Sequence, residues 1–209
     1  MFQLVAFDLY GTLLDIGGLA ARMEPLVGAG AASLLGAWRT EQLERSWECN
    51  RLDRYEPWDR VTATALEKVA PELPDRTRRQ LQRLWLSVPA YPDAAEALAE
   101  IQRRGSRRAI LSNGTRAMIE SAIAAAGLQV DRIFSADDVH VYKTDPRVYS
   151  LLDGEAHREA TLFVSSNGWD AEGARRTGRT VAWIDRGGEP PKVSPNHRVG
   201  SLTEVARLL

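Results

Sequence analysis

The sequence predicts an α/β fold in which a mostly parallel sheet carries a helical insertion after its first strand. Apolar runs too short for helices predict buried strands at residues 3–8, 108–112, 133–134, 161–165 and 180–185. After residue 88, helical patterns separate these runs, and strands that alternate with helices form parallel sheets. Residues 15–88 show helical patterns alone, so we expect a core domain of residues 1–14 and 89–209 and a helical cap domain of residues 15–88.

The first predicted strand ends at Asp8, and Gly11 lets the backbone turn sharply just after it. In open α/β sheets, ligands bind at the carboxyl ends of the strands, which is where Asp8 falls. A carboxylate in that position can act as a nucleophile. Taken alone, this stretch is more typical of an aspartate that caps a loop.

The predicted cap contains several helical pieces and a high content of tryptophan. One helix is expected over residues 38–52, with Arg39, Leu43 and Trp47 forming a stripe at helical spacing. Another is expected to begin at Asp75 as its N-cap. Four of the six tryptophans fall within residues 15–88. A helical insertion rich in large apolar side chains is well suited to act as a lid.

The second half of the chain alternates strands with helices that have recognisable ends. Asp93 is expected to cap a helix, and Gly127 to stop a later one. Glycines and prolines between residues 187 and 195 indicate a surface loop. Ser201 and Glu204 form a predicted capping box for the last helix.

Composition argues against several classes of protein. The formal net charge is −1 and no basic block is long, so we expect no nucleic-acid partner. No apolar run approaches about 20 residues, so we expect no membrane span. The N-terminus lacks the pattern of a signal peptide. One cysteine, Cys49, excludes an internal disulfide and is expected to be a buried thiol, so we expect a cytoplasmic protein.

The histidines give no indication of a metal site. His140, His157 and His197 show no spacing typical of metal ligands, and we expect all three on the surface or in loops.

Polar residues end three of the predicted strands. They are Asp8, the pair Ser112 and Asn113, and the run 165–167, while Lys143 and Asp170 lie nearby in the sequence. Parallel strands place their carboxyl ends at one edge of the sheet, so these groups can converge. One such strand end would be an ordinary helix cap. Several together, with a lysine, indicate an active site.

Four segments of the chain, taken in order, form a pattern: Asp8-x-Tyr10-Gly11-Thr12-Leu13, Leu111-Ser112-Asn113-Gly114, Tyr142-Lys143-x-Asp145-Pro146-x-x-Tyr149 and Phe163-Val164-Ser165-Ser166-Asn167-Gly168-Trp169-Asp170. This pattern resembles the haloacid dehalogenase superfamily. With the further segment Trp38-Arg39-x-x-Gln42-Leu43, it resembles more narrowly the L-2-haloacid dehalogenases. The resemblance implies a Rossmann-like, doubly wound core with a cap, a small 2-haloacid as substrate, halide as product, and a homodimer.

Two departures from the wider superfamily favour carbon–halogen cleavage. Most members are Mg²⁺-dependent phosphotransferases with additional acidic residues, where this chain has Tyr10 and Ser166. A phosphate site requires Mg²⁺ held by carboxylates, whereas halide leaves as a stable anion that needs neither proton nor metal. We therefore expect no metal and no cofactor. A metal-dependent phosphatase of the same superfamily remains the alternative, and a non-enzymatic binding protein is a third hypothesis.

The resemblance also implies how the halide is displaced. Asp8 attacks the halogen-bearing carbon in line and forms an ester, and Arg39 receives the halide with help from Asn113. Without the resemblance, Arg39 would be interpreted as an arginine lying over the cap surface. In-line attack inverts the carbon, so an L-2-haloacid gives a D-2-hydroxy acid. The substrate carboxylate is expected to bind Ser112 and the backbone N–H groups of Leu9 and Tyr10, and the apolar pocket wall to comprise Tyr10, Leu43 and Trp169.

Hydrolysis of the ester requires a general base, which the resemblance assigns to Asp170. Ser165 and Asn167 are expected to orient the water or Lys143, and Thr12 to fix the rotamer of Asp8. Asp170 could instead be an N-cap of the following helix. Tyr149 is expected to support the site through a hydrogen bond, with a packed core tyrosine as the alternative. Thr40 follows Arg39 at a position where some relatives have a longer polar side chain. The pocket wall is therefore expected to differ from theirs at Thr40.

Overall fold

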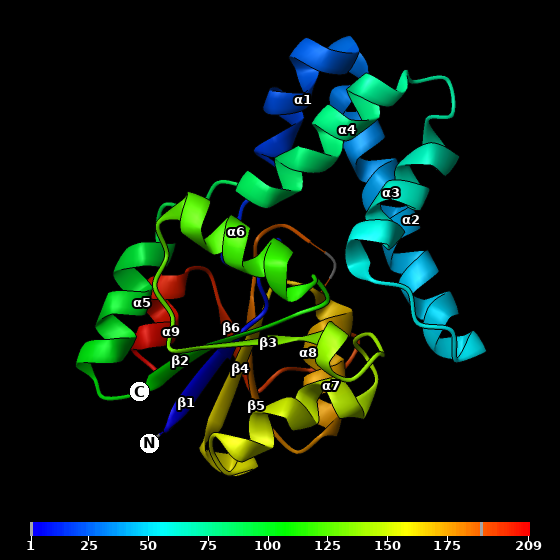
Figure 1. Ribbon diagram of the computed structural model, residues 1–209. Helices are drawn as coiled ribbons and strands as arrows, with labels where there is room; N and C mark the ends of the chain where they lie inside the picture. Colours follow the sequence, from blue (N-terminus) through cyan, green and yellow to red (C-terminus); the bar gives the residue numbers. More distant parts are fainter. Residues whose placement is uncertain (1, 189) are drawn as a thin grey trace.

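A single parallel sheet forms the core of the computed structural model, which describes residues 2–188 and 190–209 (Figure 1). Across these residues the strand order is β3-β2-β1-β4-β5-β6, and each neighbouring pair is parallel. The strand order reverses at β1, which makes the carboxyl end of β1 the expected binding crevice. The strands are β1 (Leu4–Phe7), β2 (Arg107–Ser112), β3 (Arg132–Ser135), β4 (Thr161–Ser165), β5 (Thr180–Ile184) and β6 (His197–Val199).

Helices cover both faces of this sheet. The crossovers from β1 to β2 and from β2 to β3 step in one direction, and those beyond β4 step in the other. Right-handed crossovers then place α5 and α6 on one face and α8 on the opposite face. Figure 1 shows α5 and α9 on one side and α7 and α8 on the other. These helices are α5 (Ala94–Arg103), α6 (Arg116–Ala126), α7 (Pro146–Ser150), α8 (Gly168–Arg176) and α9 (Leu202–Ala206), with short 3₁₀ turns η3 (Ala136–Asp138), η4 (Leu151–Gly154) and η5 (Arg158–Ala160).

The centre of the sheet aligns the strand ends that carry the polar residues. All four residues of β1 are buried, as expected for a strand with helices on both faces. Phe7 is paired with Ile110 of β2 and with Val164 of β4. The backbone N–H of Asp8 donates to the carbonyl of Val164 at 2.9 Å. The residues just beyond these three strands therefore share one edge.

Four helices between residues 19 and 84 lie together beyond this edge (Figure 1). The chain leaves and re-enters the sheet domain at adjacent points, because Asp15 N–H donates to the carbonyl of Pro89 and Tyr91 N–H donates to that of Leu13. The helices are α1 (Leu19–Val27), α2 (Ala31–Leu52), α3 (Trp58–Val69) and α4 (Asp75–Leu84), with 3₁₀ turns η1 (Gly28–Gly30) and η2 (Trp85–Ser87). None of the helices in the described ranges is both long enough and apolar enough to cross a membrane.

Helix α2 corrects one sequence expectation. It begins at Ala31 instead of Trp38, because the buried face already includes Leu35 in the preceding turns. The predicted stripe of Arg39, Leu43 and Trp47 lies beside the most buried face, and Trp47 is 40% exposed. The buried side chains lie on an adjacent face instead: Ala31, Leu35, Trp38, Gln42, Ser46 and Cys49.

Two predicted helix caps are also wrong in detail. Helix α4 has Pro74 at its N-cap, and Asp75 is already its first helical residue. Asp93 is at the N-cap position of α5, but its side chain caps nothing there. The Asp93 carboxylate accepts a hydrogen bond from the backbone N–H of Leu202 and pairs with Arg186, each at 2.8 Å. It therefore connects three segments of the sheet domain.

The end of the chain contains a strand that the sequence did not predict. Strand β6 has three residues and pairs only with β5, at the edge of the sheet. His197 therefore lies on a strand and not in a loop. Beyond it, Ser201 Oγ accepts from the N–H of Glu204, as a capping box requires. The Glu204 carboxylate, however, accepts from the N–H of Gly200 instead of that of Ser201.

Candidate active site

The Asp8 carboxylate is buried and surrounded by hydrogen-bond donors from three other segments. Its Oδ1 accepts from Lys143 Nζ at 2.9 Å. Its Oδ2 accepts from Thr12 Oγ1 at 3.0 Å and from Asn167 Nδ2 at 2.9 Å. The residue is only 6% exposed. Three donors facing one carboxyl group stabilise its anionic form and fix its rotamer.

Lys143 places a positive charge between two carboxylates. Its Nζ is 2.9 Å from Asp8 Oδ1 and 2.9 Å from Asp170 Oδ2, and the residue is 1% exposed. Burial alone would lower the pKa of Lys143, but the Asp170 and Asp8 carboxylates together raise it above its ordinary value. The ammonium therefore stays protonated at neutral pH and holds the two carboxylates on either side of it.

Asp170 is the second carboxylate and is completely buried. Its Oδ1 accepts a hydrogen bond from the Tyr149 hydroxyl at 2.7 Å. Burial raises the pKa of Asp170, while Lys143 and Tyr149 oppose that rise. The N-cap of α8 is Asn167, so the alternative in which Asp170 caps this helix is wrong. A buried carboxylate of raised pKa is a stronger base than an exposed one.

Serine and threonine side chains shape the turns beyond the strands. Thr12 Oγ1 accepts from the backbone N–H of Ser166 at 2.9 Å, which directs its own proton toward Asp8. Ser166 Oγ donates to the carbonyl of Gly11 at 2.8 Å, and Gly11 has φ +90°. Ser112 Oγ accepts from the N–H of Gly114, and Ser165 Oγ from that of Asn167, each at 3.2 Å.

Asn113 links the Lys143 loop to the end of β2. Its Oδ1 accepts from the backbone N–H of Lys143 at 3.0 Å. Because that donor requires the amide oxygen, the assignment of Asn113 is fixed, and its nitrogen is a donor without a partner among residues 2–188 and 190–209. Asn113 lines the same cavity as Asp8. Its NH₂ group is thus available to an anion in that cavity.

Arg39 reaches this cavity from helix α2 of the cap. Its side chain lines the cavity with Asp8, so it does not lie over the outer surface of the cap. Within the part of the chain that the structure describes, it forms no ion pair, and its one hydrogen bond is a 3.4 Å contact to Gln42. Gln42 in turn donates to Thr62 of α3 at 3.0 Å. Burial lowers the pKa of Arg39 and nearby Asp8 opposes this, but a guanidinium stays charged.

The cavity is small and opens toward a larger cleft. The inner cavity has an empty volume of about 240 Å³. The outer cleft has an empty volume of about 1030 Å³ on the same measure, and Trp169 lines both spaces. Leu43 lines only the outer cleft, whereas Leu9 is buried and its side chain lines neither. The inner lining comprises Asp8, Tyr10, Arg39, Trp58, Ser112, Asn113, Gly114, Lys143 and Trp169.

Sequence reasoning missed Trp58 as a lining residue. From the sequence alone, Trp58 is only one of the tryptophans within residues 15–88. Arg39, which lines the same cavity, lies on a different helix. Gly114 was also missed, although it lies within the quoted segment that contains Ser112 and Asn113. The packing of α2 against α3 brings Trp58 to the site, and helical periodicity does not encode that packing.

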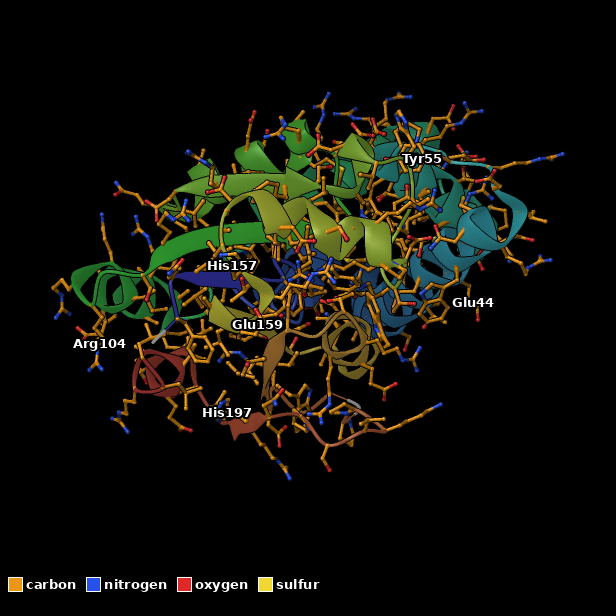
Figure 2. All side chains as sticks on the ribbon, turned by 90° about the horizontal axis from the view of Figure 1, so that it is seen from below. Glu44, Tyr55, Arg104, His157, Glu159 and His197 are labelled. Atoms are coloured by element: carbon orange, nitrogen blue, oxygen red, sulfur yellow. The ribbon has the colours of Figure 1, made fainter. Side chains whose placement is uncertain are left out.

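The residue types at the site do not suit a metal ion. Over residues 2–188 and 190–209, no three His, Cys, Asp or Glu side chains gather in an arrangement that could hold one. The two buried carboxylates, Asp8 and Asp170, both contact the Lys143 ammonium. His157 and His197 lie apart from each other and far from Glu44 on the cap (Figure 2).

The sequence matches the family of haloacid dehalogenase-like hydrolases over residues 2–178. It is 37% identical to the (S)-2-haloacid dehalogenase of Pseudomonas sp. (strain YL), over 98% of this chain and 93% of that one. The chain belongs to the (S)-2-haloacid dehalogenase family. It is also 38% identical to (S)-2-haloacid dehalogenase 4A of Burkholderia cepacia, over 97% of this chain and 93% of that one.

Solved structures of this family have the same fold. The L-2-haloacid dehalogenase from Xanthobacter autotrophicus with chloropropionic acid covalently bound matches with a TM-score of 0.93 and 29% identity. The match covers 100% of this chain and 98% of that one. The α/β, Rossmann-like fold class expected from the sequence is therefore confirmed.

Gly173 of α8 should be essential for the position of Tyr149. A Cβ at Gly173 would collide with the Tyr149 hydroxyl and lie 3.0 Å from its ring carbon Cζ. We expect Gly173→Ala to displace Tyr149 from Asp170, lowering the unfolding free energy by about 1–3 kcal/mol and reducing turnover. Gly36→Ala in α2 is the matched control, since a Cβ there meets nothing. It should raise stability by about 0.5–1 kcal/mol with turnover unchanged. Equal stability and turnover for the two variants, measured by urea unfolding and assay, would contradict this packing constraint.

The Tyr149 hydrogen bond should set the acid limb of the pH profile. A bond donated to the charged form of Asp170 lowers its pKa, so Tyr149→Phe removes an influence that opposes burial. The pKa of Asp170 then rises further, and more of this base is protonated at a given pH. We expect the acid limb of kcat to move to higher pH in Tyr149→Phe. An unmoved limb, or one moved to lower pH, would show that Asp170 does not control it.

Proposed function

We propose that this family member is an (S)-2-haloacid dehalogenase that hydrolyses short L-2-haloacids to D-2-hydroxy acids and halide. The observation that carries the proposal is the Asp8 carboxylate, held by three donors at the end of β1. It lines a small cavity with Arg39, which has no ion pair in the part of the chain that the structure describes. Such a site can attack a carbon atom and receive a departing anion on opposite sides. The bound chloropropionic acid of the Xanthobacter relative supports an ester intermediate.

In the first step, an Asp8 oxygen attacks the C2 atom of the substrate in line with the carbon–halogen bond. The new carbon–oxygen bond forms as the carbon–halogen bond breaks, and the halide leaves with the bonding electrons. Arg39 and the Asn113 NH₂ group stabilise this developing charge. Ser112 and the backbone N–H groups of Leu9 and Tyr10 are the proposed donors for the substrate carboxylate, with Trp169 against its alkyl part. The attack inverts C2.

In the second step, water attacks the carboxyl carbon of the Asp8 ester. Asp170 accepts a proton from this water, which its raised pKa favours. Ser165 acts through the turn that positions Asn167, because its hydroxyl accepts from the Asn167 backbone N–H. The acyl carbon–oxygen bond of the ester then breaks, and the leaving alkoxide takes up the proton that Asp170 accepted. The alkyl–oxygen bond stays intact, so the D-configured product leaves with an oxygen atom that came from Asp8.

A metal-dependent phosphatase is the weaker candidate. Tyr10 fills the position of the superfamily's acid/base aspartate, and its hydroxyl donates to the carbonyl of Trp85 at 3.1 Å. Ser166 fills the position of a metal-binding aspartate and bonds to Gly11. Neither residue offers a carboxylate, and the two carboxylates that remain, Asp8 and Asp170, both contact Lys143.

The proposal also covers the domain organisation, the oligomeric state and the cellular compartment. Residues 15–88 act as the cap over the core of residues 1–14 and 89–209, since Arg39 enters the cavity from this segment. Trp47 is 40% exposed on α2, and the cap face around it is the proposed homodimer contact. A single buried Cys49 suits a cytoplasmic enzyme.

Halide release from paired enantiomers tests the function directly. We expect chloride release from L-2-chloropropionate, with the D-2-hydroxy acid as product. The D-enantiomer should react at no more than about 1% of that rate, because its leaving group is misplaced and a few kcal/mol of transition-state stabilisation are lost. Dialysis against EDTA should leave the rate unchanged. Turnover of a phosphate ester that EDTA abolishes and Mg²⁺ restores, without halide release, would establish the phosphatase instead.

A further inference from the structure

One residue that lines the inner cavity carries a buried hydrogen-bond donor without a partner among the described residues. Trp58 lines the cavity with Asp8 and Arg39 and is 1% exposed, and its Nε1 has no acceptor among the residues that the structure describes. An unpaired buried N–H is destabilising by about 1–3 kcal/mol unless a ligand or water satisfies it. We therefore expect the Trp58 indole N–H to bind an acceptor when the cavity is occupied.

The other cap tryptophans give a useful contrast. Trp38 Nε1 donates to the carbonyl of Thr62 at 2.8 Å, so an indole at the α2–α3 contact can be satisfied internally. Trp85 Nε1 is also unpartnered, but Trp85 does not line the inner cavity, and nothing in the structure explains its unpaired donor. Of the two tryptophans whose buried donors lack a partner among the described residues, Trp58 is the one that lines the inner cavity.

The surroundings of Trp58 are suited to an anion. The Arg39 guanidinium carbon lies 5.8 Å from the Trp58 ring centroid, and the guanidinium has no ion pair in the described ranges. The free NH₂ of Asn113 faces the same cavity. An indole N–H, a guanidinium and an amide NH₂ are all donors and offer no acceptor to one another. The ligand that satisfies all three is a small anion.

We propose that the Trp58 Nε1–H is a third donor to the leaving halide, beside Arg39 and Asn113. This inference rests on the function proposed above. As the carbon–halogen bond breaks, its electron pair leaves with the halide, which accepts a hydrogen bond from the indole while no proton is transferred. The contact strengthens as negative charge develops, so Trp58 touches the reacting atoms and acts as a catalytic residue.

Halide product inhibition of Trp58→Phe tests this role, because phenylalanine keeps a ring and removes the donor. Loss of a hydrogen bond to a charged group corresponds to roughly 10-fold weaker binding or more. We expect the chloride inhibition constant to rise by about that factor and the iodide constant to rise least, because chloride is the stronger hydrogen-bond acceptor. Turnover of 2-chloropropionate should fall more than that of 2-iodopropionate.

Trp85→Phe is the matched control, since it removes an orphan indole donor outside the cavity. Its halide inhibition constants should equal those of the wild type. Unchanged halide inhibition constants in Trp58→Phe would overturn the donor role of Trp58. An equal rise of the constants for chloride, bromide and iodide would also overturn it, because the effect of a packing change does not follow the hydrogen-bond acceptor strength of the halide. Should Trp58→Phe fold poorly, Trp58→His retains an N–H donor and should keep the chloride preference. A wild-type enzyme that releases no halide would refute the proposed function. An active wild-type enzyme, together with a Trp58→Phe variant whose halide inhibition constants are unchanged, would refute this inference alone.

Discussion

The fold depends at its centre on a buried ammonium shared by two carboxylates. Lys143 is 1% exposed and contacts Asp8 and Asp170, each at 2.9 Å. Removing such ions from water has a penalty of several kcal/mol for each, so this arrangement persists only because every charge has a close partner. The charged groups come from the end of β1, from helix α8 beyond β4 and from the Lys143 loop, which Asn113 at the end of β2 holds. The register of β1 with β2 and β4 is therefore a condition for the chemistry as well as for packing.

Charge also explains why the cap completes the site. Asp8 and Asp170 carry two negative charges and Lys143 one positive charge, so the core alone would repel an anionic substrate. Arg39, from α2, brings the inner cavity to neutrality before substrate enters. The Gln42 and Thr62 hydrogen bonds hold the helix of Arg39 against α3. A haloacid then supplies one carboxylate and, during reaction, a second anion that the cap donors can receive.

The sequence alone predicted the strand ends and the residues that follow them, because short buried strands and sharp turns leave strong local signals. Asp8, Ser112 and Ser165 all fall where apolar runs end. It did not predict β6, whose three edge residues carry too little pattern. It misjudged Asp93, because the nearest helix end looked like its partner while the N–H of Leu202, far along the chain, is the group it binds. It missed Trp58 since its place in the cavity arises only from helix packing.

The most direct measurement follows the oxygen that enters the product. Excess enzyme reacts with an L-2-haloacid in H₂¹⁸O for a single turnover, and mass spectrometry is applied to the hydroxy acid and to the peptide that contains Asp8. A nucleophilic Asp8 predicts unlabelled product and ¹⁸O in the Asp8 carboxylate, because water attacks the ester at that carboxyl carbon. Label in the product hydroxyl, with none in the Asp8 peptide, would mean that water attacks the substrate carbon directly and would contradict a nucleophilic Asp8.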